Sequence, residues 1–86
     1  MRNKWLSITS ISGAINRFRK DKIVAIVLWE KDFEIYVQTH VERTKFGFGL
    51  DEHYGENRLN EKTFKKLRAY LDRATRIKGE LNLDSE

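Results

Sequence analysis

The alternation of apolar and polar residues predicts a chain of short strands that ends in one helix. Apolar and polar residues alternate strictly over residues 33–42: one face begins with Phe33, Ile35 and Val37, and the other face carries charged or polar side chains. This period of two is that of a strand with one buried face. Residues 5–11 alternate in the same way over a shorter stretch and predict a first strand.

The segments between these two strands are less regular. Residues 23–29 form an apolar run without a polar break, which predicts a strand covered on both faces. Such a strand is central in its sheet or lies at a subunit contact. Residues 12–22 mix apolar and basic side chains and predict a loop with at most one helical turn, and residues 30–33 predict a tight turn.

Residues 44–50 contain the sequence KFGFG and predict the last strand. One face carries Phe46, Phe48 and Leu50, and the other carries Lys45, Gly47 and Gly49. We expect the rings to be core residues shared with the helix; the alternative is an open sheet face on which they stack with nucleic-acid bases. The glycines predict a bend, a bulge or a close approach to the backbone.

A helix is predicted after Asn60, whose side chain is a good N-cap, with Glu61 at the positive helix end. Its apolar stripe consists of Phe64, Leu67, Leu71 and Ala74, with Tyr70 on the margin, and Gly79 predicts the stop. The fold class is therefore α+β, with a curved antiparallel sheet of about four strands followed by one C-terminal helix (ββββα). We expect one domain over residues 1–79 and a flexible acidic tail over residues 80–86.

The amino-acid composition limits the kinds of site and the cellular setting that we expect for this protein. The chain of 86 residues contains no cysteine, which excludes disulfides and thiolate metal sites and favours a reducing, cytoplasmic setting. No run approaches the roughly 20 apolar residues of a membrane span, and the N-terminus lacks the apolar region of a signal peptide. We therefore expect a soluble protein that does not contact a membrane.

Charge is segregated along the chain, although the formal net charge is only +4. Residues 1–23 carry six basic residues and one acidic residue, and residues 61–79 carry seven and two. The middle, residues 24–60, carries four basic and seven acidic residues. Two basic segments on one side of the fold would attract a phosphate backbone; solvated surface charge is the plainer interpretation.

The candidate ligand contacts follow from this distribution. We expect the phosphate contacts to be Arg17, Arg19, Lys20 and Lys22, together with Lys45 on the glycine face of its strand. The stacking candidates are Tyr36, which lies on the polar face of its strand, and Trp29, and of the two we expect Trp29 to be packed. Arg68 and Arg73 could extend the positive surface.

The sequence offers little for catalysis. The loop DEHYGE places Asp51, Glu52, His53 and Glu56 close together, a set able to bind a divalent metal, but all four stand on one loop. No phosphate-binding loop, nucleophile elbow or paired zinc-ligand spacing is present. We expect neither enzyme activity nor a metal or other cofactor.

The segment LNEKTFKKL, residues 59–67, has the pattern L-N-x-x-x-[FW]-x-x-L. It resembles the strand-to-helix step of the single-stranded-DNA-binding coactivator family known as positive cofactor four. The hairpin IVAIVLWEKDFEIYVQTHVE is similar to the central hairpin of that family, so that the resemblance covers about residues 23–78. Asn57 and Arg58 stand where the family usually has a Lys-Gly pair. The related purine-rich-element-binding proteins share a unit of four strands and a helix.

The resemblance implies a dimer whose curved sheets bind unpaired nucleic-acid strands without strong sequence preference. The sequence hypothesis is accordingly a homodimeric accessory factor of transcription or replication that binds single-stranded nucleic acid, with DNA favoured over RNA. The alternative is a non-enzymatic inhibitor or accessory protein that binds a protein partner. It would dock through an edge strand or through the acidic hairpin residues Glu30, Asp32, Glu34 and Glu42.

Overall fold

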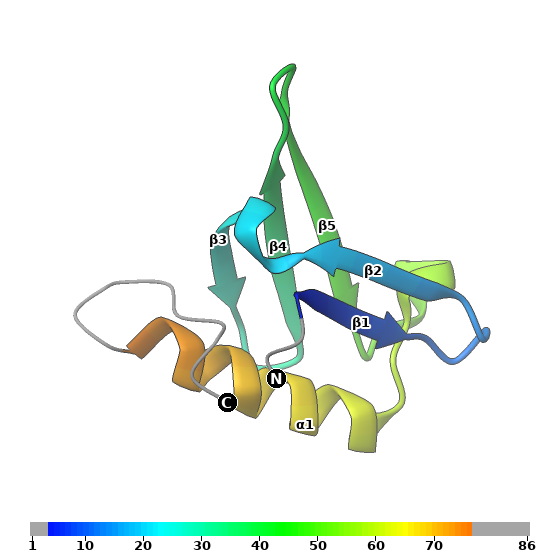
Figure 1. The fold of residues 1–86 in the computed structure, drawn as a ribbon. Coiled ribbons are helices and arrows are strands. Elements are labelled where there is room, and N and C mark those ends of the chain that lie inside the picture. Colours follow the sequence, from blue (N-terminus) through cyan, green and yellow to red (C-terminus); the bar gives the residue numbers. More distant parts are fainter. Residues whose placement is uncertain (1–3, 77–86) are drawn as a thin grey trace.

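The structure, a computed structural model, describes residues 4–76 (Figure 1). The strands are β1 (Trp5–Thr9), β2 (Ile15–Arg19), β3 (Ile23–Leu28), β4 (Asp32–Gln38) and β5 (Arg43–Gly49). The helices are η1 (Lys20–Lys22), η2 (Glu52–Asn57) and α1 (Glu61–Arg76). The predicted α+β class, with antiparallel strands followed by a C-terminal helix, is confirmed. The predicted stop at Gly79 and the tail over residues 80–86 lie outside the described residues.

The strands form two sheets rather than one sheet of about four strands. The larger sheet has the order β3-β4-β5, and the smaller sheet is the hairpin β1-β2. In the larger sheet Phe33 of β4 lies opposite Phe48 of β5, and Ile35 lies opposite Phe46. These residues belong to the core, so the expectation that the KFGFG rings pack inward is confirmed.

The β2 strand was missed because residues 12–22 do not look apolar as a whole. Within Ile15–Arg19, however, Phe18 is buried and Asn16 is half-buried, while the residues beside them are exposed. This is strand alternation with a basic outer face. Gly13, with φ of 88°, lies in the turn that joins β1 to β2, and its amide donates to the Ser10 carbonyl at 3.0 Å.

Two further local predictions need correction. The apolar strand β3 is an edge strand in the described part of the chain and pairs only with β4, so it is not central in its sheet, and its other expected position, at a subunit contact, stays a prediction. The predicted strand over residues 33–42 ends at Gln38, because Thr39 forms a turn with Glu42. The Thr39 hydroxyl accepts from the amides of Val41 and Glu42 at 3.2 and 3.1 Å. The β4-β5 hairpin projects away from α1 (Figure 1).

Helix α1 begins as predicted. The side-chain oxygen of Asn60 accepts from the Thr63 amide at 2.8 Å, which is N-cap geometry. Phe64, Leu71 and Ala74 are buried and Leu67 is partly buried, so the predicted stripe is the packing face; Tyr70 is also buried. Asn60 and the stripe thus define where the helix begins and which side faces the core.

The core joins the hairpin, the larger sheet and the helix through aromatic contacts. Phe18 of β2 meets Phe46 and Phe48 edge-on, with ring centroids 5.1 and 6.1 Å apart. Phe33 stacks on Phe64 of α1 at 5.7 Å. The inner face of β1-β2 therefore packs on the inner face of the larger sheet, which leaves the outer faces of the two sheets on opposite sides of the molecule.

The segment that precedes α1 ties both sheets together. The Ile11 amide donates to the Arg58 carbonyl at 2.8 Å, and the Leu59 amide donates to the Gly49 carbonyl at 2.8 Å. Leu59 itself is buried. The start of the helix is consequently fixed against the end of β1 and the end of β5 at once.

Candidate nucleic-acid interface

The outer face of the β1-β2 hairpin combines cations with an exposed indole. Trp5 pairs with Arg19 across the two strands, and Ser7 pairs with Arg17. All four residues are exposed, and the Arg19 guanidinium lies 5.9 Å from the centroid of the Trp5 ring. Arg19 also forms an exposed ion pair with Asp21 at 3.2 Å. The alternation of β2 thus places Arg17 and Arg19 on one solvent face beside an aromatic ring.

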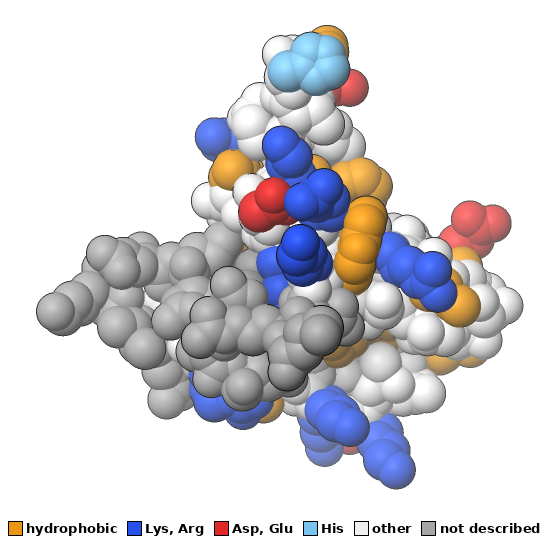
Figure 2. Space-filling model, viewed as in Figure 1, with side chains coloured by type: hydrophobic (Ala, Val, Ile, Leu, Met, Phe, Trp, Pro, Cys, Tyr) orange, Lys and Arg blue, Asp and Glu red, His pale blue; other side chains and the backbone are white. Residues whose placement is uncertain are grey.

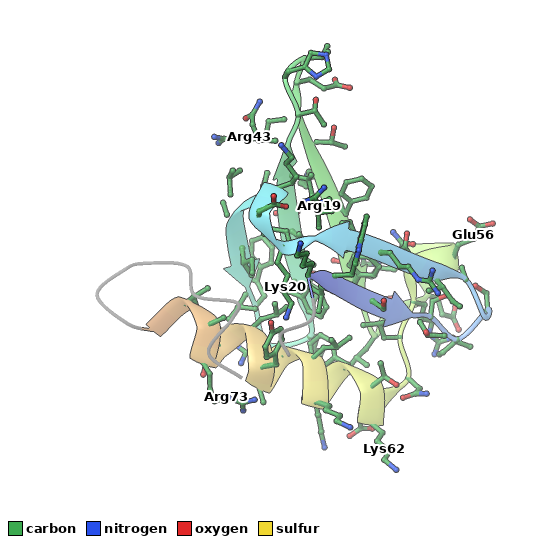
Figure 3. All side chains as sticks on the ribbon, viewed as in Figure 1. Arg19, Lys20, Arg43, Glu56, Lys62 and Arg73 are labelled. Carbon is green, nitrogen blue, oxygen red and sulfur yellow. The ribbon has the colours of Figure 1, made fainter. Side chains whose placement is uncertain are left out.

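The candidate residues Lys20 and Lys22 continue this surface into η1. Lys22 is exposed, and the Lys20 ammonium lies 5.7 Å from the centroid of the Tyr70 ring on α1. In Figure 3, Arg19 and Lys20 lie near the centre of the molecule, between the β4-β5 hairpin and α1. Figure 2 shows lysine and arginine side chains gathered at this centre and again along α1. We call Arg17, Arg19, Lys20, Lys22 and Trp5 the basic face.

A groove of about 540 Å³ runs between the hairpin and the helix. From the hairpin side it is lined by Trp5, Leu6, Ser7, Thr9 and Lys20, and from α1 by Lys62, Thr63, Lys66, Leu67 and Tyr70. We call it the β1-α1 groove. It joins the two basic segments of the sequence, because Lys20 from the first and two lysines from the second line the same cavity. Among the described residues that line it, none is acidic.

The other two candidate residues lie on a different surface. Tyr36 and Lys45 are cross-strand partners on the outer face of the larger sheet. Both contact the same carboxylate: the Tyr36 hydroxyl donates to Glu34 at 2.9 Å, and the Lys45 ammonium lies 3.4 Å from it. The hydrogen bond to Glu34, with smaller contributions from burial and from the charge of Glu34, raises the pKa of Tyr36. A carboxylate between them makes this pair a poor phosphate site.

The glycine face of β5 is covered by Tyr54 of η2. A Cβ atom at Gly47 would lie 3.4 Å from the Tyr54 ring, and a Cβ atom at Gly49 would lie 2.5 Å from it. Of the three alternatives that the glycines predict, the close approach to the backbone is the one that the structure shows. The Tyr54 hydroxyl donates to Asp32, and this hydrogen bond, together with burial and the charge of Asp32, raises the pKa of Tyr54 to about 12.

A second groove lies at the other side of α1, around Trp29. Its lining mixes both charges: Glu30, Lys31, Glu61, Lys65, Arg68 and Asp72 surround the apolar residues Leu28, Leu50, Phe64 and Ala69. Trp29 is 47% exposed, so the expectation that it is packed is wrong. The Nε–H of Arg68 donates to the Trp29 carbonyl at 2.7 Å, which links α1 to the backbone between β3 and β4.

The acidic loop does not gather into a metal site. Within residues 4–76, no group of three histidine, cysteine, aspartate or glutamate side chains is placed to hold a metal ion. His53 and Asp51 contact each other at 3.4 Å, and this hydrogen bond lowers the pKa of Asp51. The described helices include none that is long and apolar enough to cross a membrane.

The sequence prediction missed Trp5, Lys62 and Lys66 as lining residues of one groove. A signal was present for Trp5, because the alternation over residues 5–11 already assigned it to the same face as Ser7 and Thr9. The helix lysines were visible as residues off the apolar stripe, but their side could be known only once the hairpin was placed beside α1. No known protein family, curated protein or solved structure matches this chain significantly.

Proposed function

We propose that this protein binds single-stranded nucleic acid on its basic face and along the β1-α1 groove, and that it does so as a binding protein without catalytic activity. The observation that carries the proposal is the meeting of Lys20, Lys62 and Lys66 around one cavity that also exposes the Trp5 ring. Arg17 and Arg19 extend the positive charge from the rim of this cavity over the hairpin.

The chemistry of these side chains fits an unpaired strand. Each cation that contacts a phosphate releases condensed counterions, so the charged groups supply affinity without reading sequence. An exposed aromatic ring stacks on any base and contributes about 1–3 kcal/mol per base. Trp5 is 46% exposed beside Arg19, and an unpaired base, unlike one inside a duplex, presents a free face to it. DNA is the ligand that the resemblance of residues 59–67 favours, in a transcription or replication accessory role.

The rival proposal, docking of a protein on the acidic hairpin, has less support. Of its four carboxylates, Asp32 accepts from Tyr54 and Glu34 is engaged by Tyr36 and Lys45. Glu30 and Glu42 remain exposed, but they flank opposite ends of β4. The acidic residues therefore do not form one continuous surface, whereas the cations line a shared groove.

A dimer belongs to the same proposal. The edge strand β3 has the uncharged sequence IVAIVL, and its Val24 is 43% exposed. Natural proteins commonly protect a free edge with charges, which β3 lacks. Pairing with a second copy about a two-fold axis would place the two β3 strands antiparallel and extend the sheet.

The test is a fluorescence titration with an unlabelled pyrimidine oligonucleotide and a matched duplex at two salt concentrations. We expect saturable binding that prefers the single strand and weakens steeply with salt. The triple variant Arg17→Ala, Arg19→Ala, Lys20→Ala should lose most of the affinity and flatten the salt dependence.

The matched control removes the same three charges elsewhere, with Lys31→Ala, Lys65→Ala and Arg73→Ala. These residues lie outside the basic face and the β1-α1 groove. The proposal fails if the folded wild-type protein does not bind the single strand at low salt, or if both triple variants lose affinity equally.

A further inference from the structure

We infer that the β1-α1 groove is a site for one nucleotide unit, with its phosphate beside Lys62 and Lys66 and its base against the wall formed by Trp5, Leu67 and Tyr70. The inference rests on the proposed function and assigns it a specific site with a ligand of defined chemistry. It makes a separate claim, because an extended basic surface could hold a strand without any nucleotide pocket.

The positive charges that line the groove favour binding of an anion. Lys62 and Lys66 are four residues apart on α1, and both line the cavity that Lys20 enters from the other side. Like charges at this spacing disfavour a helix by a few tenths of a kcal/mol. Over the described part of the chain, neither helix lysine has an acidic partner, whereas the neighbouring Lys65 pairs with Glu61 at 2.9 Å. A bound phosphate would relieve this repulsion.

The remaining lining residues favour a flat ring of the ligand beside the anion. Trp5, Leu6, Leu67 and Tyr70 supply an apolar and aromatic wall, and Ser7, Thr9 and Thr63 supply hydroxyl groups for a sugar or a base edge. The volume of about 540 Å³ lies within the range of about 300–1,000 Å³ typical of small-molecule sites. A ligand with a phosphate at one end and a flat ring at the other matches both halves of the groove.

The groove around Trp29 provides an internal contrast. It also contains an indole and cations, but Glu30, Glu61 and Asp72 line it together with Lys31, Lys65 and Arg68. The acidic side chains there offset the positive charge that a phosphate requires. The described residues that line the β1-α1 groove likewise include an indole and cations but no carboxylate, so we assign the nucleotide to this groove alone.

The experiment uses thymidine 5′-monophosphate as the probe, with thymidine and inorganic phosphate titrated separately. A Trp29→Phe background leaves Trp5 as the single indole, so that a fluorescence change reports the groove. We expect saturable quenching by the nucleotide, at least tenfold weaker binding of thymidine, and no quenching by phosphate alone. In the same background, Lys62→Gln with Lys66→Gln should weaken nucleotide binding at least tenfold.

The control is Lys65→Gln with Arg73→Gln, which removes the same charge from the same helix outside the β1-α1 groove and should change nucleotide affinity less than twofold. Circular dichroism verifies that both double variants are folded. Failure of the nucleotide to quench Trp5, or an equal loss in both double variants, overturns the inference. Equal binding of an acidic peptide overturns it as well, since the groove would then respond to charge alone.

Oligonucleotide titrations of the same proteins separate the two proposals. If the wild type binds the single strand but Lys62→Gln with Lys66→Gln binds it equally well, the nucleotide site is wrong and the basic face alone carries the function. If the mononucleotide binds at the groove but the single strand does not bind, the site is correct and the proposed function is wrong. If neither ligand binds, both proposals fail.

Discussion

The ring of Tyr54 lies directly over the backbone of Gly49, at the end of the strand that contains KFGFG. A Cβ atom on Gly49 would stand 2.5 and 2.8 Å from two ring carbons and 2.9 Å from the Cβ of Asp32. The Tyr54 hydroxyl donates to the carboxylate of that same aspartate. The two glycines of the motif therefore make room for a tyrosine that covers the outer face of the sheet, while Phe46 and Phe48 fill the inner face.

Gly49→Ala should destabilise the protein by about 1–3 kcal/mol, because a methyl group there overlaps both the ring and Asp32. Gly47→Ala is the matched control, since its Cβ would lie 3.4 Å from the ring, and it should cost less than about 1 kcal/mol. Urea denaturation of both variants measures the difference. An equal loss in the two would mean that Tyr54 does not rest on Gly49.

Tyr54→Phe should lower the free energy of unfolding at pH 7 by about 1 kcal/mol, since it leaves the partly buried Asp32 without this donor. It should also change the alkaline stability. In the folded protein the pKa of Tyr54 is raised to about 12, above its ordinary value near 10. The folded state therefore holds the hydroxyl proton more tightly than the unfolded state.

This contribution is fully present below pH 10 and is lost as the pH rises toward 12. The stability difference between wild type and Tyr54→Phe should thus shrink over that interval, as measured by denaturation at a series of pH values. A difference that stays constant from pH 8 to the alkaline end would show that the hydroxyl titrates alike in both states.

Asn60→Ala should destabilise the protein by about 1 kcal/mol, because it removes the side-chain oxygen that accepts from the Thr63 amide at 2.8 Å. Asn60→Ser is the conservative control and should retain most of the stability, since serine is also a good N-cap. Thermal unfolding followed by circular dichroism compares the two. Equal melting temperatures for Asn60→Ala and wild type would contradict the cap.

Sequence reasoning succeeded where the signal was local. The Asn60 cap, the stripe from Phe64 to Ala74 and the alternation of Phe33, Ile35 and Val37 are each readable within a few residues, and each is present in the structure. The close approach to the glycine face was also predictable, because glycine is the residue that permits it. The identity of the approaching group, Tyr54, was not predictable, because it depends on where η2 folds back onto β5.

The errors arose where tertiary packing decided the outcome. The β2 strand has only one fully buried residue, Phe18, so its composition looked like that of a loop. The apolar run of β3 predicts a strand that is central or at a subunit contact, and the pairing of β3 with β4 alone, in the described part of the chain, excludes the central position. The six candidate site residues do not share one surface, since Tyr36 and Lys45 lie on the outer face of the larger sheet and the other four lie in β2 and η1.

Removal of one charge at a time tests which of the two surfaces, the larger sheet or the β1-β2 hairpin, binds the oligonucleotide. Lys45→Ala should leave oligonucleotide affinity within about twofold of wild type, because the lysine faces Glu34 on the outer face of the larger sheet. Arg17→Ala should weaken binding several-fold and reduce the salt slope by about 1. A titration at low salt compares the two single variants. The reverse order would move the binding surface to the larger sheet.

Val24→Lys tests the proposed β3 dimer. Val24 is 43% exposed at the point where the β3-β4 register shifts, so lysine should be accepted there without loss of the fold. An antiparallel pairing of two copies would place one added lysine from each copy in the shared strand pair, where charged side chains disfavour the association of apolar edges. Light scattering should therefore give a dimer for wild type and a monomer for Val24→Lys.

Val41→Lys is the control, because Val41 is 76% exposed in the β4-β5 turn, away from that edge, and should leave the dimer intact. A wild-type monomer at high concentration, or a dimer that survives Val24→Lys, would remove β3 as the contact.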